Sequence, residues 1–317
     1  MGRVVRVVRH LAGRPRIAGR VVLTLGNFDG VHLGHQAILR QAAERARVAG
    51  GRVAVVTFEP HPLVVLAPER APAMLQSLHD RLATLRASGV AVTILPRFTR
   101  RFAALEPEAF VGDFLLRHLE LAHVVVGYNV TFGRNRAGSS DTLRRLGDAH
   151  GFGVDVVGPV TVADDRVSSS RIRRAVQAGE VARAESLLGR PFALRGRVVP
   201  GDRRGRLLGF PTANLHVRSG LVLPADGVYA VQAEVDGRRH PAVLNVGVRP
   251  TFGGRRRTIE AHLLDFDGDV YRRWMRVHLV ERLRGERTFT GPDALKAAIA
   301  DDVAHARRVF AGGAAGA

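Results

Sequence analysis

Short apolar segments alternate with longer amphipathic segments along roughly the first 190 residues of the chain. The apolar run from Val21 to Leu25 stops at Gly26, and Leu33 to Val48 then carries apolar or small residues at a helical period. This alternation predicts buried strands connected by helices. It predicts further strands at 53–58, 90–95, 122–127 and 154–157, a helix between Ser77 and Gly89, and helices at 107–119 and 142–150.

The order of these elements predicts the architecture of the N-terminal part. Strands separated by helices of this length form a parallel sheet with helices on both faces. We therefore expect an α/β fold with a doubly wound parallel sheet. In such sheets ligands bind beyond the carboxyl ends of the strands, so the loops that follow the predicted strands are candidate sites.

The periodicity changes after about Leu188, where short strands and tight turns replace the helices. In 229–235 and 275–279 apolar residues alternate with polar ones as in half-buried strands, and Asp236-Gly237 is typical of a hairpin turn. A final helix is expected at 293–310. The pattern predicts a small C-terminal antiparallel β-barrel with a terminal helix. We expect two domains, residues 1–188 and 189–317.

The composition fits two folded domains and removes several kinds of chemistry. The chain has 317 residues, of which 46% are hydrophobic and 24% charged, and it has no cysteine. Disulfides, thiolate zinc sites and cysteine nucleophiles are therefore excluded. No apolar run of signal-peptide length follows the basic segment 1–20, and no segment has the apolar length that spans a bilayer. We expect a cytoplasmic protein without a membrane partner.

The formal net charge of +19 is a reason to consider a nucleic-acid partner. The positive charges are almost all arginine, with Lys296 the only lysine, and they are spread along the chain. Arginine also suits polyphosphate ligands, because its planar fork pairs with two phosphate oxygens. A nucleic-acid-binding barrel needs aromatic residues along an exposed sheet, whereas this barrel region has Trp274 and two tyrosines. We expect no nucleic-acid partner.

The segment from Gly26 to His35 connects the first predicted strand and helix and has the composition of a phosphate-binding loop. A helix start offers unpaired N–H groups and the positive end of the helix dipole. Gly26, Gly30 and Gly34 permit close approach of backbone to a ligand. His32 and His35 lie on one side of this helix start and can donate hydrogen bonds to phosphate oxygens, as adenylyl transfer requires.

Two other interpretations of these histidines stay open on the residues alone. Both rings can be ordinary surface or packing residues, although two at this spacing in a strand–glycine loop–helix setting favour a function. A metal site would need further ligands, and Glu59 and His61, after the second predicted strand, are the nearest candidates. We expect phosphate donors rather than metal ligands.

Four segments together resemble a known family. The run from Asn27 to His35 resembles the HxGH signature of nucleotidylyl transferases, preceded by Asn-Phe-Asp-Gly-Val. Segments 57–62 (TFEPHP), 127–133 (GYNVTFG) and 166–173 (RVSSSRIR) extend the resemblance to the N-terminal module of bacterial bifunctional riboflavin kinase/FAD synthetases. The resemblance implies an FMN adenylyltransferase site that includes Gly26, Phe28, Asp29, His32, Gly34, His35, Asn129, Arg166, Ser169, Ser170 and Arg173.

The serine- and arginine-rich segment is chemically suited to that role. Residues 168–170 supply hydroxyls and a helix N-terminus, and Arg166 and Arg173 supply charge for a triphosphate. A simple N-cap explains one serine but not three serines flanked by arginines. Two positions depart from the family pattern. Ser170 stands where threonine is usual, which keeps the hydroxyl, and Val130 stands where relatives often have an aromatic residue, which could loosen flavin contacts.

A second candidate site lies in the predicted barrel. Residues 201–214 form a glycine-rich turn without Walker spacing, so a P-loop kinase is excluded. With the Pro-Thr-Ala-Asn that ends it, the segment resembles the riboflavin kinase motif. The resemblance implies that Gly201 and Gly205 approach the nucleotide and that Thr212 and Asn214 hold Mg²⁺ and phosphates. Oxygen ligands of this kind are the ones that Mg²⁺ prefers.

Residues 245–253 and 258–266 extend this resemblance, and Glu260 matches the proposed catalytic base of the family. In the predicted strand Glu260 points away from its apolar neighbours Ile259 and Ala261. A carboxylate there can take the proton from the ribityl 5′-hydroxyl. Without the surrounding motif, a solvated glutamate on an exposed strand would be the simpler interpretation.

Both motif sets are complete, and the resemblance covers about residues 21–308. It implies an enzyme with ATP, riboflavin and FMN as substrates and Mg²⁺ as cofactor, which phosphorylates riboflavin to FMN and adenylylates FMN to FAD. One alternative is a nucleotidylyl transferase with another phosphate acceptor and an unrelated barrel. The other is the basic nucleic-acid-binding protein considered above. The sequence indicates no oligomeric state.

Overall fold

The computed structural model describes residues 6–9, 17–201, 205, 209–251 and 254–313. Residues 202–204 and 206–208 of the glycine-rich segment, and 252–253 further on, lie outside the described residues. The chain divides into two compact units, Met1–Ser169 and Ser170–Ala317. Each unit is described by itself below.

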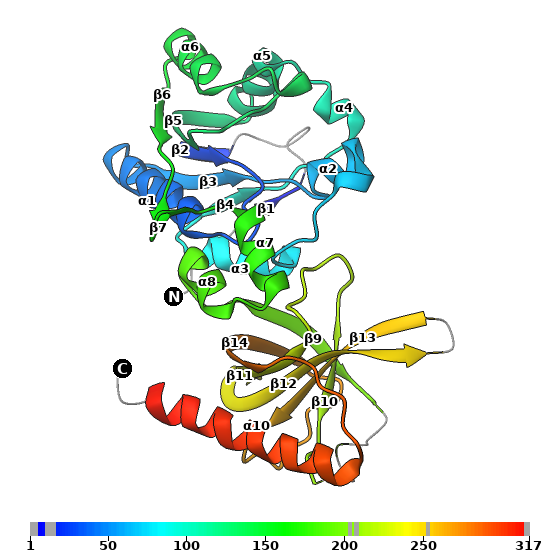
Figure 1. Cartoon of the computed structure of the whole chain (residues 1–317). Helices are drawn as coiled ribbons and strands as arrows, with labels where there is room; N and C mark the ends of the chain where they lie inside the picture. The colour runs from blue at the N-terminus through cyan, green and yellow to red at the C-terminus, as the bar shows by residue number, and fades with distance from the viewer. Residues whose placement is uncertain (1–5, 10–16, 202–204, 206–208, 252–253, 314–317) are drawn as a thin grey trace. The chain divides into compact units, whose positions relative to one another are not determined.

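The first unit is built on a six-stranded parallel sheet with the strand order β1-β4-β3-β2-β5-β6 (Figure 1). Its central strands are apolar because they are covered on both faces. In β2, for example, Val21 to Leu25 are all buried. The strands are β1 (Arg6–Val8), β2 (Ile17–Leu25), β3 (Arg52–Val56), β4 (Val92–Ile94), β5 (Leu119–Gly127) and β6 (Gly153–Val157).

Helices cover both faces of this sheet, as the alternating pattern predicted. Val22 packs on one face against the helices α1 (Leu33–Val48) and α3 (Leu78–Ala87). Val21 and Leu23 pack on the other face with residues of η2 and α6. The remaining segments of the unit are α2 (Pro62–Leu66), η1 (Pro68–Arg70), α4 (Arg100–Ala103), α5 (Pro107–Ala109), η2 (Phe110–Leu116), η3 (Arg134–Arg136), α6 (Ser140–His150), β7 (Thr161–Val162) and β8 (Asp165–Arg166).

Several features of this unit differ from the sequence expectation, and two of them concern the sheet and a helix that covers it. The helix expected at 107–119 is one α-helical turn, α5, followed by the π-helical segment η2, and it ends at Leu116. Strand β1 was not expected, because a three-residue segment carries no periodicity of its own and forms only by pairing with β4. The described part of the chain contains no helix long and apolar enough to cross a membrane.

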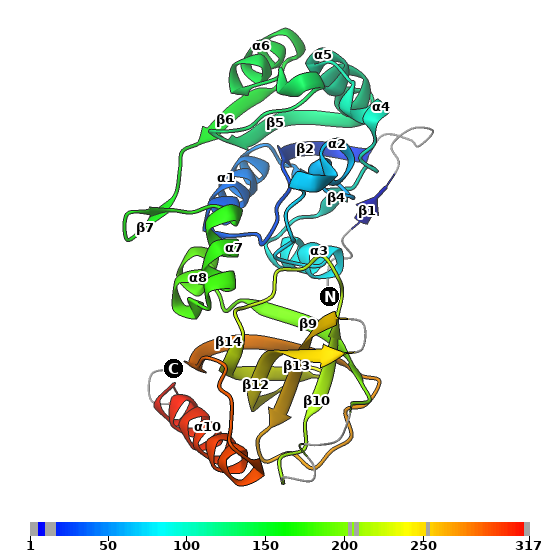
Figure 2. The same ribbon diagram turned by 45° about the vertical axis from the view of Figure 1, so that its right-hand side comes forward.

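The second unit contains a closed six-stranded barrel with the order β10-β13-β12-β11-β14-β9, all pairs antiparallel. The predicted alternation is present: Met275, Val277 and Leu279 are buried and the residues between them are less so. Two helices, α7 (Ser169–Ala178) and α8 (Val181–Leu188), precede it (Figure 2). The strands are β9 (Ala193–Val199), β10 (Ala213–Val217), β11 (Gly227–Val235), β12 (Arg238–Thr251), β13 (Gly254–Leu263) and β14 (Trp274–Arg284).

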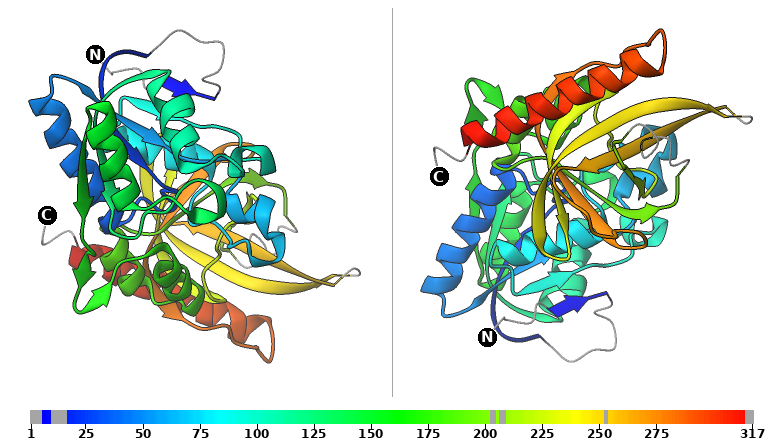
Figure 3. Two further views of the ribbon diagram at one scale, coloured as in Figure 1. Left: turned by 90° about the horizontal axis from the view of Figure 1, so that it is seen from above. Right: turned by 90° about the horizontal axis from the view of Figure 1, so that it is seen from below.

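The predicted hairpin and terminal helix are also present. Asp236 and Gly237 connect β11 to β12 with φ of +50° and +78°, as a two-residue turn with two left-handed residues requires. Helix α10 (Pro292–Gly313) lies along the outside of the barrel (Figure 3). Its Val303 and Ala306 pack with residues of β11 and β12. The expected fold class, a doubly wound α/β unit plus a small antiparallel barrel with a terminal helix, is confirmed.

Candidate active sites

The strand order of the first unit marks one place for a ligand. The chain runs from β2 through β3 to β4 on one side of the sheet, and then returns to place β5 and β6 on the other side of β2. Open α/β sheets bind ligands where the order reverses, beyond the carboxyl ends of the strands. The loop that starts at Gly26 follows β2, and Asn129 follows β5, so both lie at this edge.

The loop between β2 and α1 has an unusual backbone. Phe28, Gly30 and Val31 have φ of +49°, +82° and +40°. A positive φ is unfavourable for a β-branched residue, and such strain concentrates at functional sites. The side chains of Phe28 and Val31 are fully buried beneath the loop, which holds this conformation in place. Phe28 thus supports the loop from below, with its ring 4.9 Å from that of His35.

The two histidines lie together, as their spacing predicted. Their rings stack with centroids 3.7 Å apart. His32 is the N-cap of α1: its Nδ1 accepts a hydrogen bond from the main-chain N–H of His35 at 3.3 Å. A neutral His32 therefore carries its proton on Nε2, where it can donate to a ligand. A Cβ at Gly34 would lie 3.2 Å from the His32 ring, so glycine gives that ring its space.

The environment of His35 keeps it uncharged. Burial, followed by the neighbouring His32, lowers the pKa of His35 well below its usual value. Its Nδ1 is buried without a hydrogen-bond partner among the described residues. A neutral imidazole keeps one N–H donor and one acceptor. The pair can thus offer donors to a phosphate without two adjacent positive charges.

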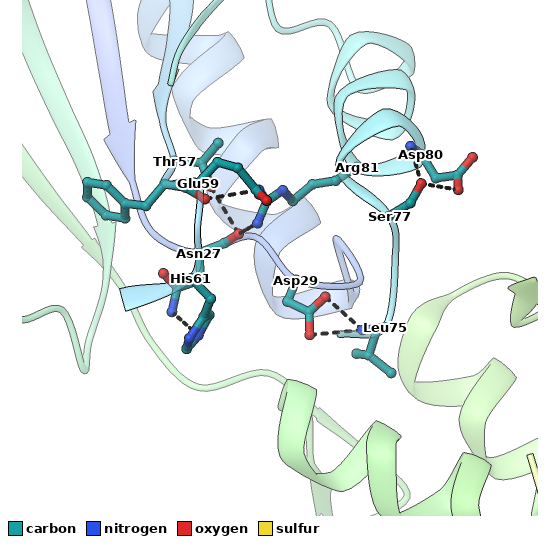
Figure 4. Close-up of polar contacts among 10 residues, drawn as sticks. Asn27, Asp29, Thr57, Glu59, His61, Leu75, Ser77, Asp80 and Arg81 are labelled. Atoms are coloured by element: carbon teal, nitrogen blue, oxygen red, sulfur yellow. Dashed lines mark hydrogen bonds and ion pairs between the residues drawn. The ribbon is translucent and has the colours of Figure 1, made fainter. Parts of the chain in front are cut away.

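A buried arginine holds the start of the loop (Figure 4). Arg81 of α3 is 1% exposed and donates through Nη1 to the carbonyl oxygen of Asn27 at 3.0 Å. Its Nη2 donates to the carbonyl oxygen of Phe58 and to Glu59 Oε2, each at 3.0 Å. The guanidinium therefore ties the segment after β2 to the segment after β3. The Thr57 hydroxyl adds a second bond to the Asn27 carbonyl, also at 3.0 Å.

Asp29 also holds the loop in place through hydrogen bonds of its side chain and its main chain. Its carboxylate, 1% exposed, accepts from the main-chain N–H of Leu75 at 2.9 and 3.2 Å (Figure 4). Its carbonyl oxygen accepts from the hydroxyl of Ser169 at 2.9 Å, across 140 residues of sequence. This hydrogen bond joins the first loop to the serine segment.

The other predicted residues of the adenylyltransferase site lie on exposed segments. Asn129 Oδ1 lies beside Gly127 at the end of β5, where a Cβ would be 3.4 Å from it. Arg166 Nη1 donates to the hydroxyl of Tyr128 at 3.2 Å. In the second unit, Arg173 Nη1 lies 3.5 Å from the hydroxyl of Ser170, at the start of α7.

The candidate metal ligands after β3 have other partners. Glu59 is paired with Arg81, and His61 Nε2 lies 3.0 Å from the side-chain nitrogen of Asn27. Over the ranges that the structure describes, no three His, Asp or Glu side chains converge as a metal cluster.

The barrel brings the predicted kinase residues together. Asn214 on β10 pairs with Glu260 on β13, and Glu260 also pairs with Asn245 on β12. The Thr212 hydroxyl lies 3.4 Å from Glu260 Oε2. Glu260 is only partly buried between the buried Ile259 and Ala261, so it points away from the apolar side, as expected. Hydroxyl, amide and carboxylate oxygens therefore share one patch.

Both predicted glycines border this patch. A Cβ at Gly201 would lie 2.2 Å from Asn214 Nδ2, and a Cβ at Gly205 would lie 3.2 Å from Thr212 Oγ1 and 2.4 Å from the Phe210 carbonyl. Any larger residue at these positions would displace the amide of Asn214 or the backbone at Phe210. The two glycines are therefore required by contacts within the protein as well as by any approach of a nucleotide.

Family comparison gives each unit a separate match. The FAD synthetase family matches residues 14–171, and the riboflavin kinase family matches residues 188–310. A bifunctional riboflavin kinase/FMN adenylyltransferase of Escherichia coli K12 is 42% identical over 309 residues, which cover 97% of this chain and 98% of that protein. The chain belongs to the bifunctional riboflavin kinase/FMN adenylyltransferase family.

Other members and a solved structure agree over nearly the full length. The Pseudomonas fluorescens member of the family is 43% identical over 94% of this chain, and the Bacillus subtilis member 38% over 91%; the matches cover 95% and 92% of those proteins. A crystal structure described as a macrolide-efflux protein from Streptococcus pneumoniae superposes with a TM-score of 0.88 at 30% identity, covering 96% of this chain and 99% of that one. The resemblance seen in the sequence is confirmed.

Sequence reasoning missed several residues of this bifunctional riboflavin kinase/FMN adenylyltransferase family member that contact or pair with the predicted site residues or their loops. Arg81 is one, although an arginine on the buried side of an amphipathic helix, one turn before Leu85, was a visible signal. Asn245, paired with Glu260 across the barrel, is another. Tyr128, the partner of Arg166, had no signal, because the contact joins residues 38 apart through an exposed loop.

Proposed function

We propose that this chain carries out two consecutive ATP-dependent reactions, one in its N-terminal part and one in its C-terminal part. The chain is a bifunctional enzyme that phosphorylates riboflavin to FMN in its C-terminal part and adenylylates FMN to FAD in its N-terminal part. One observation carries the assignment of residues to reactions. His32, His35, Asn129 and Arg166 all belong to the first unit, whereas Thr212, Asn214 and Glu260 all belong to the second. Ser170 and Arg173, at the start of α7, are the two proposed adenylylation residues that follow the division of the chain after Ser169.

In the first unit, a phosphate oxygen of FMN attacks the α-phosphorus of ATP, and the bond to the leaving pyrophosphate breaks. Negative charge then builds up on the α-phosphate oxygens. His32 Nε2 and His35 are the proposed donors to those oxygens, held at the start of α1 by the strained loop. Arg166 and the hydroxyl of Ser169 in this unit, together with Ser170 and Arg173 at the start of α7, are the proposed partners of the triphosphate.

In the second unit, the 5′-hydroxyl oxygen of riboflavin attacks the γ-phosphorus of ATP, and the bond to the oxygen of ADP breaks. Glu260 is the proposed base that takes the hydroxyl proton, because its carboxylate lies on the less buried side of β13. Thr212 and Asn214, beside it, are the proposed contacts to the ATP phosphates.

Mg²⁺ is the proposed cofactor of the kinase reaction. The donor set fits, since Thr212 and Asn214 present a hydroxyl and an amide oxygen next to the Glu260 carboxylate, and such hard oxygen ligands suit this ion. When bound there, Mg²⁺ would neutralise phosphate charge.

The domain boundary and the location are proposals too. A boundary at residue 188 is supported by the riboflavin kinase match, which begins at residue 188, and by the end of α8 at Leu188. A cytoplasmic location is supported by the cysteine-free composition. Small-molecule substrates are the partners that both reactions require.

A product time course tests this assignment directly. The purified chain with ATP and Mg²⁺ is followed by chromatography, starting from riboflavin and separately from FMN. We expect FMN to appear before FAD in the first case, and FAD without a delay in the second. FAD that forms from riboflavin in a sample where added FMN is not converted, or no FAD at all, would contradict the two-step scheme.

A further inference from the structure

Helix α7 starts with residues assigned to FAD formation, but its other end is fastened to the barrel. Nη1 of Arg282, on β14, donates to the carbonyl oxygen of Ala178, the last residue of α7, at 3.3 Å. The two residues are 104 positions apart in the sequence. The last turn of α7 contains no basic residue of its own. Arg282 therefore supplies the cation that the negative end of this helix dipole favours.

The side chain of Arg282 occupies a slot between two glycines. A Cβ at Gly179 would lie 2.9 Å from both Cδ and Nη1 of Arg282. A Cβ at Gly227 would lie 3.3 Å from its Nε. Both glycines have positive φ, +76° and +151°. A side chain at either position would therefore be disfavoured by the backbone conformation as well as by its contact with Arg282. The absence of side chains at Gly179 and Gly227 thus leaves the space through which Arg282 reaches the end of α7.

The loop before β11 completes the attachment. Nη2 of Arg282 donates to the carbonyl oxygen of Asp226 at 2.9 Å, and the N–H of Ala225 donates to the carbonyl oxygen of Val176 in the last turn of α7 at 3.3 Å. Arg257, three positions before Glu260 on β13, donates to the Pro224 carbonyl at 2.6 Å and pairs with the Asp226 carboxylate. Strands β13 and β14 of the barrel therefore both hold the C-terminal end of α7.

We propose that Arg282, although it belongs to the barrel, is a positioning residue for FAD formation. It fixes the end of α7, and the ten-residue helix transmits that placement to Ser169, Ser170 and Arg173 at its start. This inference rests on the proposed role of those three residues in adenylylation. Small displacements of a positioning group are costly, since a shift of about 1 Å can reduce a rate by about 100-fold.

The main test compares Arg282→Met with Arg282→Lys. Methionine keeps much of the length and loses the cation and the donors, whereas lysine keeps a cation that can reach the helix end. We expect Arg282→Met to lower kcat for FMN-to-FAD conversion by about 10- to 100-fold, and Arg282→Lys to restore part of it. Riboflavin phosphorylation should change little in either variant. Arg276→Met is the matched control, because this arginine of β14 pairs with Glu234 at 3.9 Å instead.

A second variant leaves the arginine in place. Gly179→Ala puts a methyl group 2.9 Å from the guanidinium stem and should shift it away from Ala178. It should therefore reproduce the selective loss of FAD formation, even if Arg282→Met does not fold. Equal losses in both reactions, or FAD formation that stays at the wild-type level in both variants, would overturn the inference.

One further variant shows whether a negative result contradicts this inference or the proposed function on which it rests. Arg173→Ala removes a proposed triphosphate contact at the start of α7 without touching its anchored end. If Arg173→Ala abolishes FAD formation while Arg282→Met and Gly179→Ala leave it intact, the anchoring idea is wrong and the site assignment survives. If Arg173→Ala has no effect, the assignment of the helix start to adenylylation itself fails.

Discussion

The rings of His32 and His35 stack with their planes 18° from parallel and their centroids 3.7 Å apart. Two imidazolium ions at that separation would repel each other, so at most one ring carries a charge. Burial together with His32 lowers the pKa of His35, which identifies His35 as the neutral member. Nδ1 of His32 caps the helix, so a neutral His32 carries its proton on Nε2.

The first prediction concerns His35→Ala. We expect FMN-to-FAD conversion to fall by about 100- to 1,000-fold, because donors to a transition-state oxygen are typically worth about 2.7–4 kcal/mol. Riboflavin phosphorylation should stay near the wild-type rate, since His35 belongs to the other unit. The measurement is a time course from FMN and another from riboflavin. His150→Ala, at the exposed end of α6, is the control. A loss of both activities in a variant that melts like the wild type would contradict two separate sites.

The second prediction follows from the pKa of His35. Unfolded histidine titrates near pH 6.5, whereas folded His35 titrates below that value. Between the two pKa values the unfolded chain binds more protons, so stability rises with pH there and is lost as the pH falls. Urea unfolding at several pH values should show this slope in the wild type and a shallower one in His35→Gln. Identical slopes would show that His35 is not the titrating group.

Glu260→Gln should have the opposite selectivity to His35→Ala. The amide is nearly isosteric but accepts no proton at neutral pH, so we expect FMN formation to fall by about 100- to 10,000-fold. Added FMN should still be converted to FAD at close to the wild-type rate. Glu281→Gln, on an exposed position of β14, is the matched control. Normal FMN formation by Glu260→Gln would remove Glu260 from the role of base.

A fourth prediction concerns Mg²⁺. Excess chelator should stop riboflavin phosphorylation, and added Mg²⁺ should restore it, because the ATP phosphates and the Glu260 carboxylate bring clustered negative charge. Thr212→Ala and Asn214→Ala should raise the Mg²⁺ concentration required for half-maximal FMN formation. FMN adenylylation, measured in the same samples, should keep its wild-type Mg²⁺ dependence. Turnover that persists in chelator would show that the kinase needs no divalent ion.

The fifth prediction tests a cluster that belongs to neither predicted site. Asp155 on β6 accepts from Arg45 Nη2 and Gln41 Nε2 of α1 at 3.0 and 2.9 Å, and His123 of β5 lies 3.2 Å away. Burial raises the pKa of Asp155, but the hydrogen bonds from Arg45, Gln41 and His123 outweigh it and lower the pKa to about 2. The cluster therefore fastens α1 to the sheet.

Asp155→Ala should reduce the free energy of unfolding at neutral pH by about 1.5–3 kcal/mol, the range for hydrogen bonds to charged groups. The contribution of a carboxyl with a lowered pKa is complete above about pH 3.9, its unfolded value, and is lost as the pH falls through about 2. The difference in free energy of unfolding between wild type and variant should therefore become smaller as the pH falls through this range. Asp148→Ala, exposed on α6, is the control. A constant difference at all pH values would contradict this account.

Periodicity predicted the local elements well where local signals were strong. Helix α1 has the predicted ends, and α3 starts after Ser77, whose hydroxyl accepts from the N–H of Asp80 as an N-cap should. The π-helical turn in η2 was missed, because Phe110 to Leu116 has the same apolar spacing as an ordinary helix. The sequence of α1 and of α3 was enough to predict each helix, whereas the sequence of η2 does not distinguish a π-helical turn from an α-helix.

Contacts between segments that are distant in the sequence could not be predicted from the residue pattern of one segment. The bond from Ser169 to the Asp29 carbonyl and the hold of Arg81 on Asn27 join residues 140 and 54 positions apart. Each depends on how strands and helices pack, and no local spacing encodes it. The motifs indicated which residues belong to a site, whereas the arginine that orients the loop was found only in the folded chain.

The closed barrel sets an order for synthesis on the ribosome. Strand β9 must pair with both β10 and β14, so its second edge stays open until residues 274–284 have emerged. The parallel sheet of the first unit, in contrast, has all its strands once Val157 has been made. Domains generally fold as units from the N-terminus during translation. The nascent FAD-forming unit therefore completes its sheet while the barrel still presents an unpaired strand edge, and during that interval the edge is open to pairing with another chain.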